Sequence, residues 1–83
     1  MTENKTDKIY DDVKKIITSY LRLDDDEIKP ETHIVNDAGA DSLALVELGF
    51  QLTEKFGVPI TDTSENMLIF QNLVDYIREN IDS

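Results

Sequence analysis

Three stretches of the chain place apolar residues at the spacing of an α-helix, which has 3.6 residues per turn. The first covers residues 7–21, and its apolar positions are Ile9, Val13, Ile16, Ile17 and Tyr20. The last covers residues 70–81, with Phe70, Leu73, Val74, Ile77 and Ile81. Charged and polar residues occupy the opposite side of both stretches. Each is therefore predicted to be an amphipathic helix that turns one face to the core.

The middle helix is predicted over residues 41–56, from the N-cap residue Asp41 to the natural stop at Gly57. It carries two neighbouring apolar stripes, one assigned to the core and one that could face outward. The first consists of Leu45, Leu48, Leu52 and Phe56. The second consists of Leu43, Val46 and Phe50, with Glu47 and Glu54 along its edge. Because a docking patch is apolar surface with a polar rim, we expect the second stripe to contact partners; burial of both stripes is the alternative.

A short third helix is predicted over residues 62–67, where Asp62 and Glu65 have the spacing of a capping box. A long loop separates the first two helices, and Ile34 and Val35 are expected to attach it to the core. No stretch alternates as a strand would. We therefore predict an all-α four-helix bundle with three longer helices and one short one, forming a single domain over residues 1–83.

Charge narrows the range of functions. The 83 residues contain 18 Asp and Glu against 8 Lys and Arg, a formal net charge of −10 and a pI near 4.2. Such a field repels nucleic acid and anionic lipid and favours proteins with basic patches. The chain has no cysteine, so any thiol chemistry must come from a separate group. No apolar stretch is of signal-peptide or membrane-spanning type, so a cytoplasmic location is expected. We also expect a monomer.

Two classes of site fit the sequence poorly. A calcium-binding loop starting at Asp24 would place Lys29 where glycine is required and Val35 where the bidentate glutamate belongs. Serine hydrolysis lacks a G-x-S-x-G motif, and the one histidine, His33, is expected to be a surface or loop-packing residue. We predict neither a metal site nor an enzyme activity.

The candidate for chemistry is Ser42, in the segment Gly39-Ala40-Asp41-Ser42-Leu43. It lies in the first turn of the middle helix, where free N–H groups and the positive end of the dipole would accommodate an anion joined to its oxygen. Gly39 allows the backbone to approach closely just before it. A serine after a capping aspartate is common, and alone it indicates a structural role.

The surrounding residues change that interpretation. The segment D-A-G-A-D-S-L-A-L-V-E-L, residues 37–48, resembles the attachment motif of acyl carrier proteins, approximately D-L-G-A-D-S-L-D-x-V-E-L. The resemblance extends to the first helix, the acidic loop, the E-K-F-G segment before Ile60 and the D-Y-I segment of the last helix. It implies that Ser42 carries 4'-phosphopantetheine, installed from coenzyme A by a phosphopantetheinyl transferase that Asp41 helps to engage.

The resemblance also implies surfaces for partners and cargo. Acyltransferases, ketosynthases or acyl-activating enzymes would bind the outer stripe, through Leu43, Val46, Glu47 and Phe50, with Glu54 at its edge. The acyl chain would fold back among the helices near Leu48, Leu52, Phe56, Ile60 and Met67. The implied function is a carrier that presents thioester-bound acyl groups to fatty acid, polyketide or lipid biosynthetic enzymes. The alternatives are an aminoacyl or peptidyl carrier and an acidic interaction module whose Ser42 is never modified.

Departures from the family pattern indicate a specialised carrier. Ala44 replaces an acidic residue, Ala38 a leucine, and Lys55 a frequent glutamate. Gly49 lies inside the middle helix, where glycine costs about 1 kcal/mol relative to alanine. Our hypothesis is that Gly49 widens a groove for the arm or the acyl chain; close helix packing explains it equally well.

Overall fold

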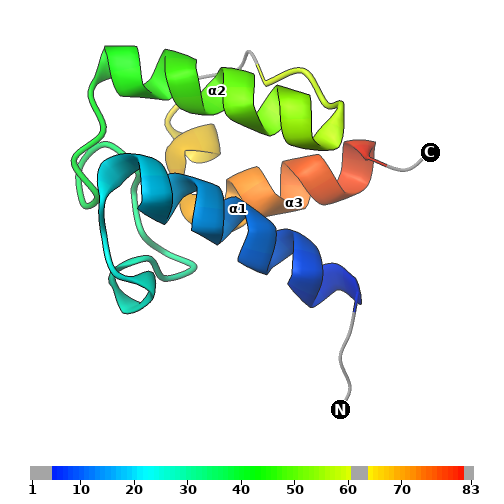
Figure 1. The fold of residues 1–83 in the computed structure, drawn as a ribbon, viewed down its shortest axis with the longest axis horizontal. Helices are drawn as coiled ribbons and strands as arrows, with labels where there is room; N and C mark the ends of the chain where they lie inside the picture. The colour runs from blue at the N-terminus through cyan, green and yellow to red at the C-terminus, as the bar shows by residue number, and fades with distance from the viewer. Residues whose placement is uncertain (1–4, 61–63, 82–83) are drawn as a thin grey trace.

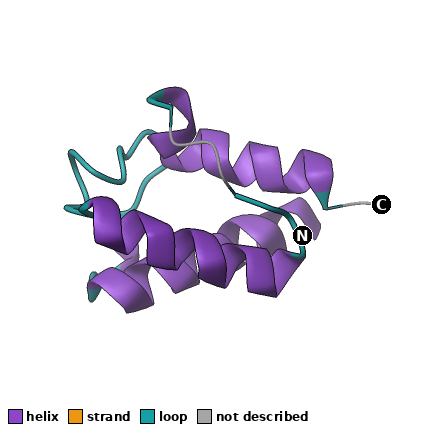
Figure 2. Ribbon diagram, turned by 90° about the horizontal axis from the view of Figure 1, so that it is seen from above, coloured by secondary structure: helices purple, strands orange, loops and turns teal. Residues whose placement is uncertain are grey.

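The computed structural model describes residues 5–60 and 64–81. Three α-helices account for most of them, joined by two short 3-10 turns (Figure 1). In chain order these elements are α1 (Lys5–Leu21), η1 (Asp25–Glu27), α2 (Ser42–Phe56), η2 (Asn66–Leu68) and α3 (Phe70–Asn80). Figure 2 shows helices and loops over this part of the chain. The prediction of an all-α fold is therefore confirmed.

Helix α1 contacts both of the other long helices, as its apolar face predicts. In Figure 1, α2 lies along the top and α1 crosses in front of α3 below it. Val13 and Ile17 of α1 are fully buried in the space that the helices enclose. The helix ends where Arg22 adopts the left-handed conformation, with φ of 61°, and the N–H of Leu23 returns to the carbonyl of Thr18 at 2.9 Å.

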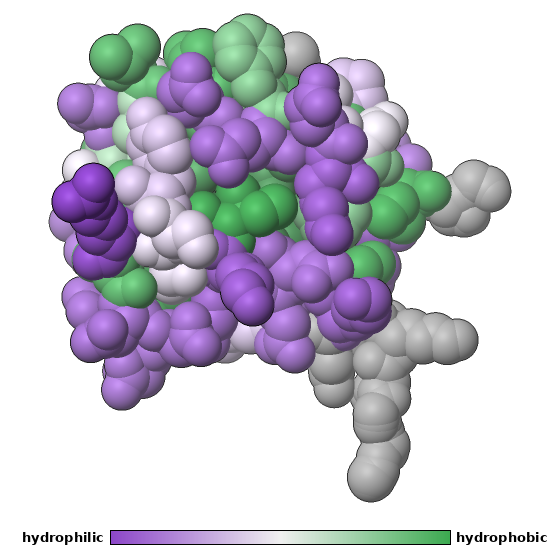
Figure 3. Space-filling view, viewed as in Figure 1, coloured by the Kyte–Doolittle hydropathy of each residue, from purple (hydrophilic) through white to green (hydrophobic). Residues whose placement is uncertain are grey.

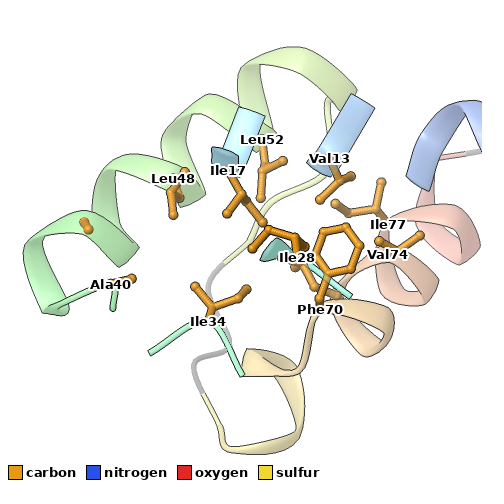
Figure 4. Packing of buried hydrophobic residues seen from close by; sticks show 12 residues of the cluster. Val13, Ile17, Ile28, Ile34, Ala40, Leu48, Leu52, Phe70, Val74 and Ile77 are labelled. Atoms are coloured by element: carbon orange, nitrogen blue, oxygen red, sulfur yellow. The ribbon is translucent and has the colours of Figure 1, made fainter. Parts of the chain in front are cut away.

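The centre of the core is Phe70, the first residue of α3 (Figure 4). Its ring is fully buried, and the ring of Tyr10 from α1 meets it edge-on, with centroids 5.0 Å apart. Val74 and Ile77 follow on the same face of α3 and are also fully buried. Burial raises the pKa of Tyr10, and the nearby carboxylates of Asp11 and Glu31 raise that pKa further.

The long loop between α1 and α2 is fastened to the core by isoleucines. Ile28 and Ile34 are almost completely buried, and Val35 is half-buried. Ile34 and Val35 are both predicted to attach this loop; the structure confirms Ile34, whereas Val35 does not belong to the core cluster. The loop also contains a hydrogen bond of its own, in which the hydroxyl of Thr32 accepts from the N–H of Lys29 at 2.7 Å.

The predicted short helix over residues 62–67 is not confirmed, so the four-helix bundle is not confirmed either. Asp62, its expected cap, lies outside the described residues, and the part described is the single 3-10 turn η2. This turn ends because the next residue, Ile69, is extended and pairs with His33 in an isolated antiparallel bridge. The N–H of Phe70 donates to the carbonyl of Thr32 at 2.9 Å. Pairing with the long loop thus follows the end of η2 and leads directly into α3.

Candidate functional site

Asp41 caps α2, as predicted, and places Ser42 as the first residue of the helix. The backbone of Asp41 is extended, and its Oδ1 accepts a hydrogen bond from the N–H of Ala44 at 2.8 Å. Its carbonyl accepts from the N–H of Leu45 at 2.9 Å. The side chain of Ser42 is exposed. The predicted anchor is therefore accessible at the positive end of a 15-residue helix.

Two backbone N–H groups next to this anchor remain available. Across the described chain, the N–H groups of Ser42 and Leu43 donate to no protein acceptor, whereas those of Ala44 and Leu45 are taken by Asp41. Helix starts commonly leave such donors for an anion. A phosphate attached to the Ser42 oxygen would lie beside them, so the residues present fit a negatively charged tether.

The turn before Ser42 is held firmly to the core. Gly39 has φ of +86°, a left-handed conformation that favours glycine, and nothing lies within 4 Å of the position a Cβ would occupy. Glycine is therefore needed here for the backbone angle rather than for close approach. The next residue, Ala40, is buried, and its N–H donates to the carbonyl of Ile34 at 3.0 Å. The site is thus anchored two residues before the exposed serine.

His33 connects this loop to η2. Its ring is buried, and Nδ1 accepts from the N–H groups of Val35 at 3.2 Å and Asn36 at 3.0 Å. Nε2 is 3.1 Å from Oε1 of Glu65, so the neutral ring that donates from Nε2 satisfies every contact. The N–H of His33 also donates to Oδ2 of Asp37 at 2.9 Å. His33 is a loop-packing residue, one of the two roles predicted for it.

The outer stripe of α2 is uncovered over the described residues. Leu43 is 71% exposed, Val46 54% and Phe50 63%, and Glu47 and Glu54 are exposed beside them. Figure 3 shows hydrophobic atoms gathered along the upper edge of the molecule, where α2 lies. On the inner stripe Leu48 and Leu52 are buried, as predicted, while Leu45 and Phe56 are half-buried against the core.

A groove runs from Ser42 along α2. Its volume is about 620 Å³, and its far end is formed by Thr53 and by the segment that follows α2. The lining residues are Ser42, Leu45, Val46, Gly49, Phe50, Thr53, Pro59 and Ile60. Six of these residues lie on α2, between positions 42 and 53, and the other two lie in the segment after the helix, so the groove leads away from the anchor.

A smaller cavity of about 40 Å³ lies on the inner side of α2. Its lining is Ile17, Ile34, Leu45, Leu48, Gly49, Leu52, Ile60, Met67, Leu68 and Leu73. Four of the five residues expected to surround an acyl chain are among them. Phe56, the fifth, lies outside this lining because it is the last residue of α2, one turn beyond Leu52.

Several residues of the groove and the cavity were not singled out from the sequence. Ile17 comes from α1, Ile34 from the long loop, and Leu73 from α3. Ile17 and Leu73 show only the periodicity of core positions, and Ile34 was expected only to attach the loop to the core; neither signal distinguishes a cavity wall from ordinary packing. Thr53 and Pro59 of the groove gave no signal at all. Gly49, by contrast, was noticed in the sequence because it is a glycine inside a predicted helix.

No helix among the described residues is long and apolar enough to cross a membrane.

Comparison with known proteins finds matches over most of the chain. The family model described as "phosphopantetheine attachment site" matches residues 11–65, which include Ser42. The acyl carrier protein of Campylobacter lari is 46% identical over 74 residues, covering 88% of this chain and 95% of its own length. That of Campylobacter jejuni is 44% identical over 69 residues (82% and 90%), and that of Campylobacter curvus 40% over 72 residues (86% and 94%).

Proposed function

The chain belongs to the family of phosphopantetheine-bearing acyl carrier proteins, and from this premise we propose that Ser42 is its attachment residue. As a member it carries acyl groups on a covalent 4'-phosphopantetheine and is not itself an enzyme. The observation that carries the assignment to Ser42 is its exposed side chain at the first position of α2, beside two N–H groups that donate to no acceptor in the described chain.

Loading at this position is a phosphoryl transfer. The Ser42 oxygen attacks the phosphorus of coenzyme A that bears the pantetheine, and a new oxygen–phosphorus bond forms. The diphosphate bond of coenzyme A breaks, adenosine 3',5'-bisphosphate leaves, and the hydroxyl proton passes to a base of the transferase. Asp41 holds the helix start in place while this happens, because its carboxylate caps Ala44.

The phosphopantetheine group supplies a thiol, which the chain itself lacks because it has no cysteine. Acyl groups are held there as thioesters. The described residues contribute the anchor, the anion-accepting helix start and the groove that leads away from Ser42 along α2. A groove that begins at the anchor gives the arm a surface to lie on between transfers.

We assign partner docking to the outer stripe of α2, composed of Leu43, Val46 and Phe50 and edged by Glu47 and Glu54. The support is an apolar surface that stays exposed beside two carboxylates, on a chain with a formal net charge of −10. The partners are a phosphopantetheinyl transferase and acyltransferases, ketosynthases or acyl-activating enzymes with basic patches. Charge attraction would speed encounter, and the apolar stripe would supply the contact.

We assign the acyl chain to the cavity beneath α2, through Leu48, Leu52, Ile60 and Met67. Every side chain that lines this cavity is apolar. The ammonium group of an aminoacyl cargo would lose its hydration there without gaining a partner, a cost of several kcal/mol. The lining therefore favours a hydrocarbon chain over an amino acid or a peptide.

Intact mass measurement tests the attachment. We expect the protein, incubated with coenzyme A, magnesium and a phosphopantetheinyl transferase, to gain the mass of one phosphopantetheine group. Ser42→Ala should gain none, because the attacking oxygen is removed. Ser19→Ala is the matched control, since Ser19 is also an exposed serine and should leave loading intact. A wild-type chain that gains no mass would instead be an unmodified interaction module.

A further inference from the structure

Three residues line both the groove and the cavity and so form the boundary between them. Leu45, Gly49 and Ile60 belong to the lining of both, whereas Ser42 and Val46 line the groove alone and Leu48 and Leu52 line the cavity alone. Leu45 and Gly49 come from α2, and Ile60 comes from the segment after it. An apolar chain that passes from the groove into the cavity must therefore cross between α2 and Ile60.

Gly49 lies close to Ile60 across this boundary. A Cβ atom built on Gly49 would lie 3.3 Å from the carbonyl oxygen of Ile60 and 4.0 Å from its Cβ. The first distance is tighter than most real Cβ contacts. A side chain at position 49 would thus take up the space between α2 and Ile60. Glycine leaves this space free, even though glycine inside a helix costs about 1 kcal/mol of stability relative to alanine.

The opposite side of the boundary is held loosely. The N–H of Ile60 donates to Oγ1 of Thr53 at 3.3 Å, and the hydroxyl of Tyr76 donates to the carbonyl of Pro59 at 3.4 Å. Both distances exceed the usual range for such bonds. These two hydrogen bonds therefore hold the Pro59–Ile60 backbone only weakly, whereas Gly49 lies inside the regular helix α2.

We propose that Gly49 sets the width of the passage by which an acyl chain on the Ser42 arm moves from the groove into the cavity. The inference rests on the proposed carrier function and adds a residue that determines which chains are sequestered. In the structure the cavity of about 40 Å³ is little larger than the roughly 30 Å³ share of one water molecule. A chain enters as Ile60 separates from α2, and the missing side chain at position 49 leaves room for it.

The experiment compares octanoyl and acetyl thioesters on wild type and Gly49→Ala. A phosphopantetheinyl transferase loads each group directly from its coenzyme A thioester, and intact mass confirms loading. Cleavage by hydroxylamine then reports how much of the thioester is exposed. In wild type we expect the octanoyl thioester to be cleaved more slowly than the acetyl one. In Gly49→Ala the extra methyl should speed octanoyl cleavage at least about fivefold, as overpacking of a filled core would, and leave acetyl cleavage unchanged.

Gln51→Ala is the control, because Gln51 is an exposed residue of α2 that lines neither the groove nor the cavity. It should keep the octanoyl protection of wild type. The acetyl forms control for any general effect of the substitutions on the arm. Equal octanoyl protection in wild type and Gly49→Ala, or equal loss in Gln51→Ala, overturns the role of Gly49. Failure of wild type to load at all overturns the carrier function instead, so the two failures are distinguishable.

Discussion

The two apolar stripes of α2 contain similar side chains and have opposite fates. Leu48 and Leu52, on the inner stripe, are 3% and 1% exposed, whereas Val46 and Phe50, on the outer stripe, are more than half exposed. The difference comes from what surrounds the helix: α1 packs against α2 on the inner side, and no described element covers the outer side. Hydrophobicity alone therefore does not say which face of a helix serves folding.

The two stripes gain the free energy of burial in different events, the inner one on folding and the outer one on binding. Full burial of a leucine or phenylalanine side chain stabilises a fold by about 1.5–3 kcal/mol relative to leaving it exposed. The inner stripe receives this stabilisation within the chain itself. The outer stripe can receive it only when a partner covers it, so its apolar area is available for binding. Substitutions on the two stripes should consequently affect different measurements.

The largest effect is expected on the inner stripe, for Leu52→Ala. Removing a fully buried leucine should lower the free energy of unfolding by about 3 kcal/mol, because transfer energy is lost and a cavity remains. Urea denaturation followed by circular dichroism measures this. The exposed neighbour Gln51→Ala is the control and should stay within about 0.5 kcal/mol of wild type. A loss below about 1 kcal/mol for Leu52→Ala would mean that the inner stripe is not the core that the structure describes.

A smaller effect, on a different quantity, is expected for Phe50→Ala on the outer stripe. Its free energy of unfolding should change by no more than about 1 kcal/mol, since the side chain is already exposed. The kcat/KM for loading by a phosphopantetheinyl transferase should fall about tenfold, the size of a modest hot spot. Gln51→Ala again serves as the control.

The reverse pattern for Phe50→Ala would remove the distinction between the stripes. Unchanged loading and acyl transfer, together with a loss of about 3 kcal/mol in stability, would make Phe50 a core residue and end its docking role.

The elements that the sequence predicted well are those with local signals. The bounds of α2 follow from a capping aspartate at 41 and a glycine at 57, and the structure shows both caps, with φ of 72° at Gly57. The apolar periods of α1 and α3 likewise depend on residues three and four apart. Ser42 was singled out as the attachment residue by the acyl carrier motif. These signals lie within one or two helical turns, where sequence and structure are directly related.

What the sequence did not predict depends on contacts between distant segments. Of the helix expected over 62–67, the described part is the turn η2, which ends where Ile69 pairs with His33, 36 positions earlier in the chain. The bond between His33 and Glu65 likewise joins residues 32 apart. The cavity combines residues from all three helices and the long loop, so its position depends on packing angles that no local pattern encodes. Phe56 lies outside the lining of this cavity, and its predicted contact with the acyl chain stays a prediction.

The smallest effect concerns Asp41, which stands where the two roles of α2 meet. Its carboxylate caps the helix, and the family resemblance also gives it a contact with the transferase. Asp41→Asn keeps an oxygen that can accept from the N–H of Ala44 and removes only the charge, so stability should be nearly unchanged. Asp41→Ala removes the cap as well and should cost about 1 kcal/mol, measured by urea denaturation.

Loading rates of the two Asp41 variants then separate capping from recognition. If the charge engages the transferase, both variants should load more slowly to a similar extent, and added salt should slow wild type toward them. If Asp41 acts only by ordering the helix start, Asp41→Asn should load like wild type and Asp41→Ala alone should be slow. The second result would limit partner recognition to the outer stripe and to its carboxylates at Glu47 and Glu54. Asp41 would then act only in capping the helix.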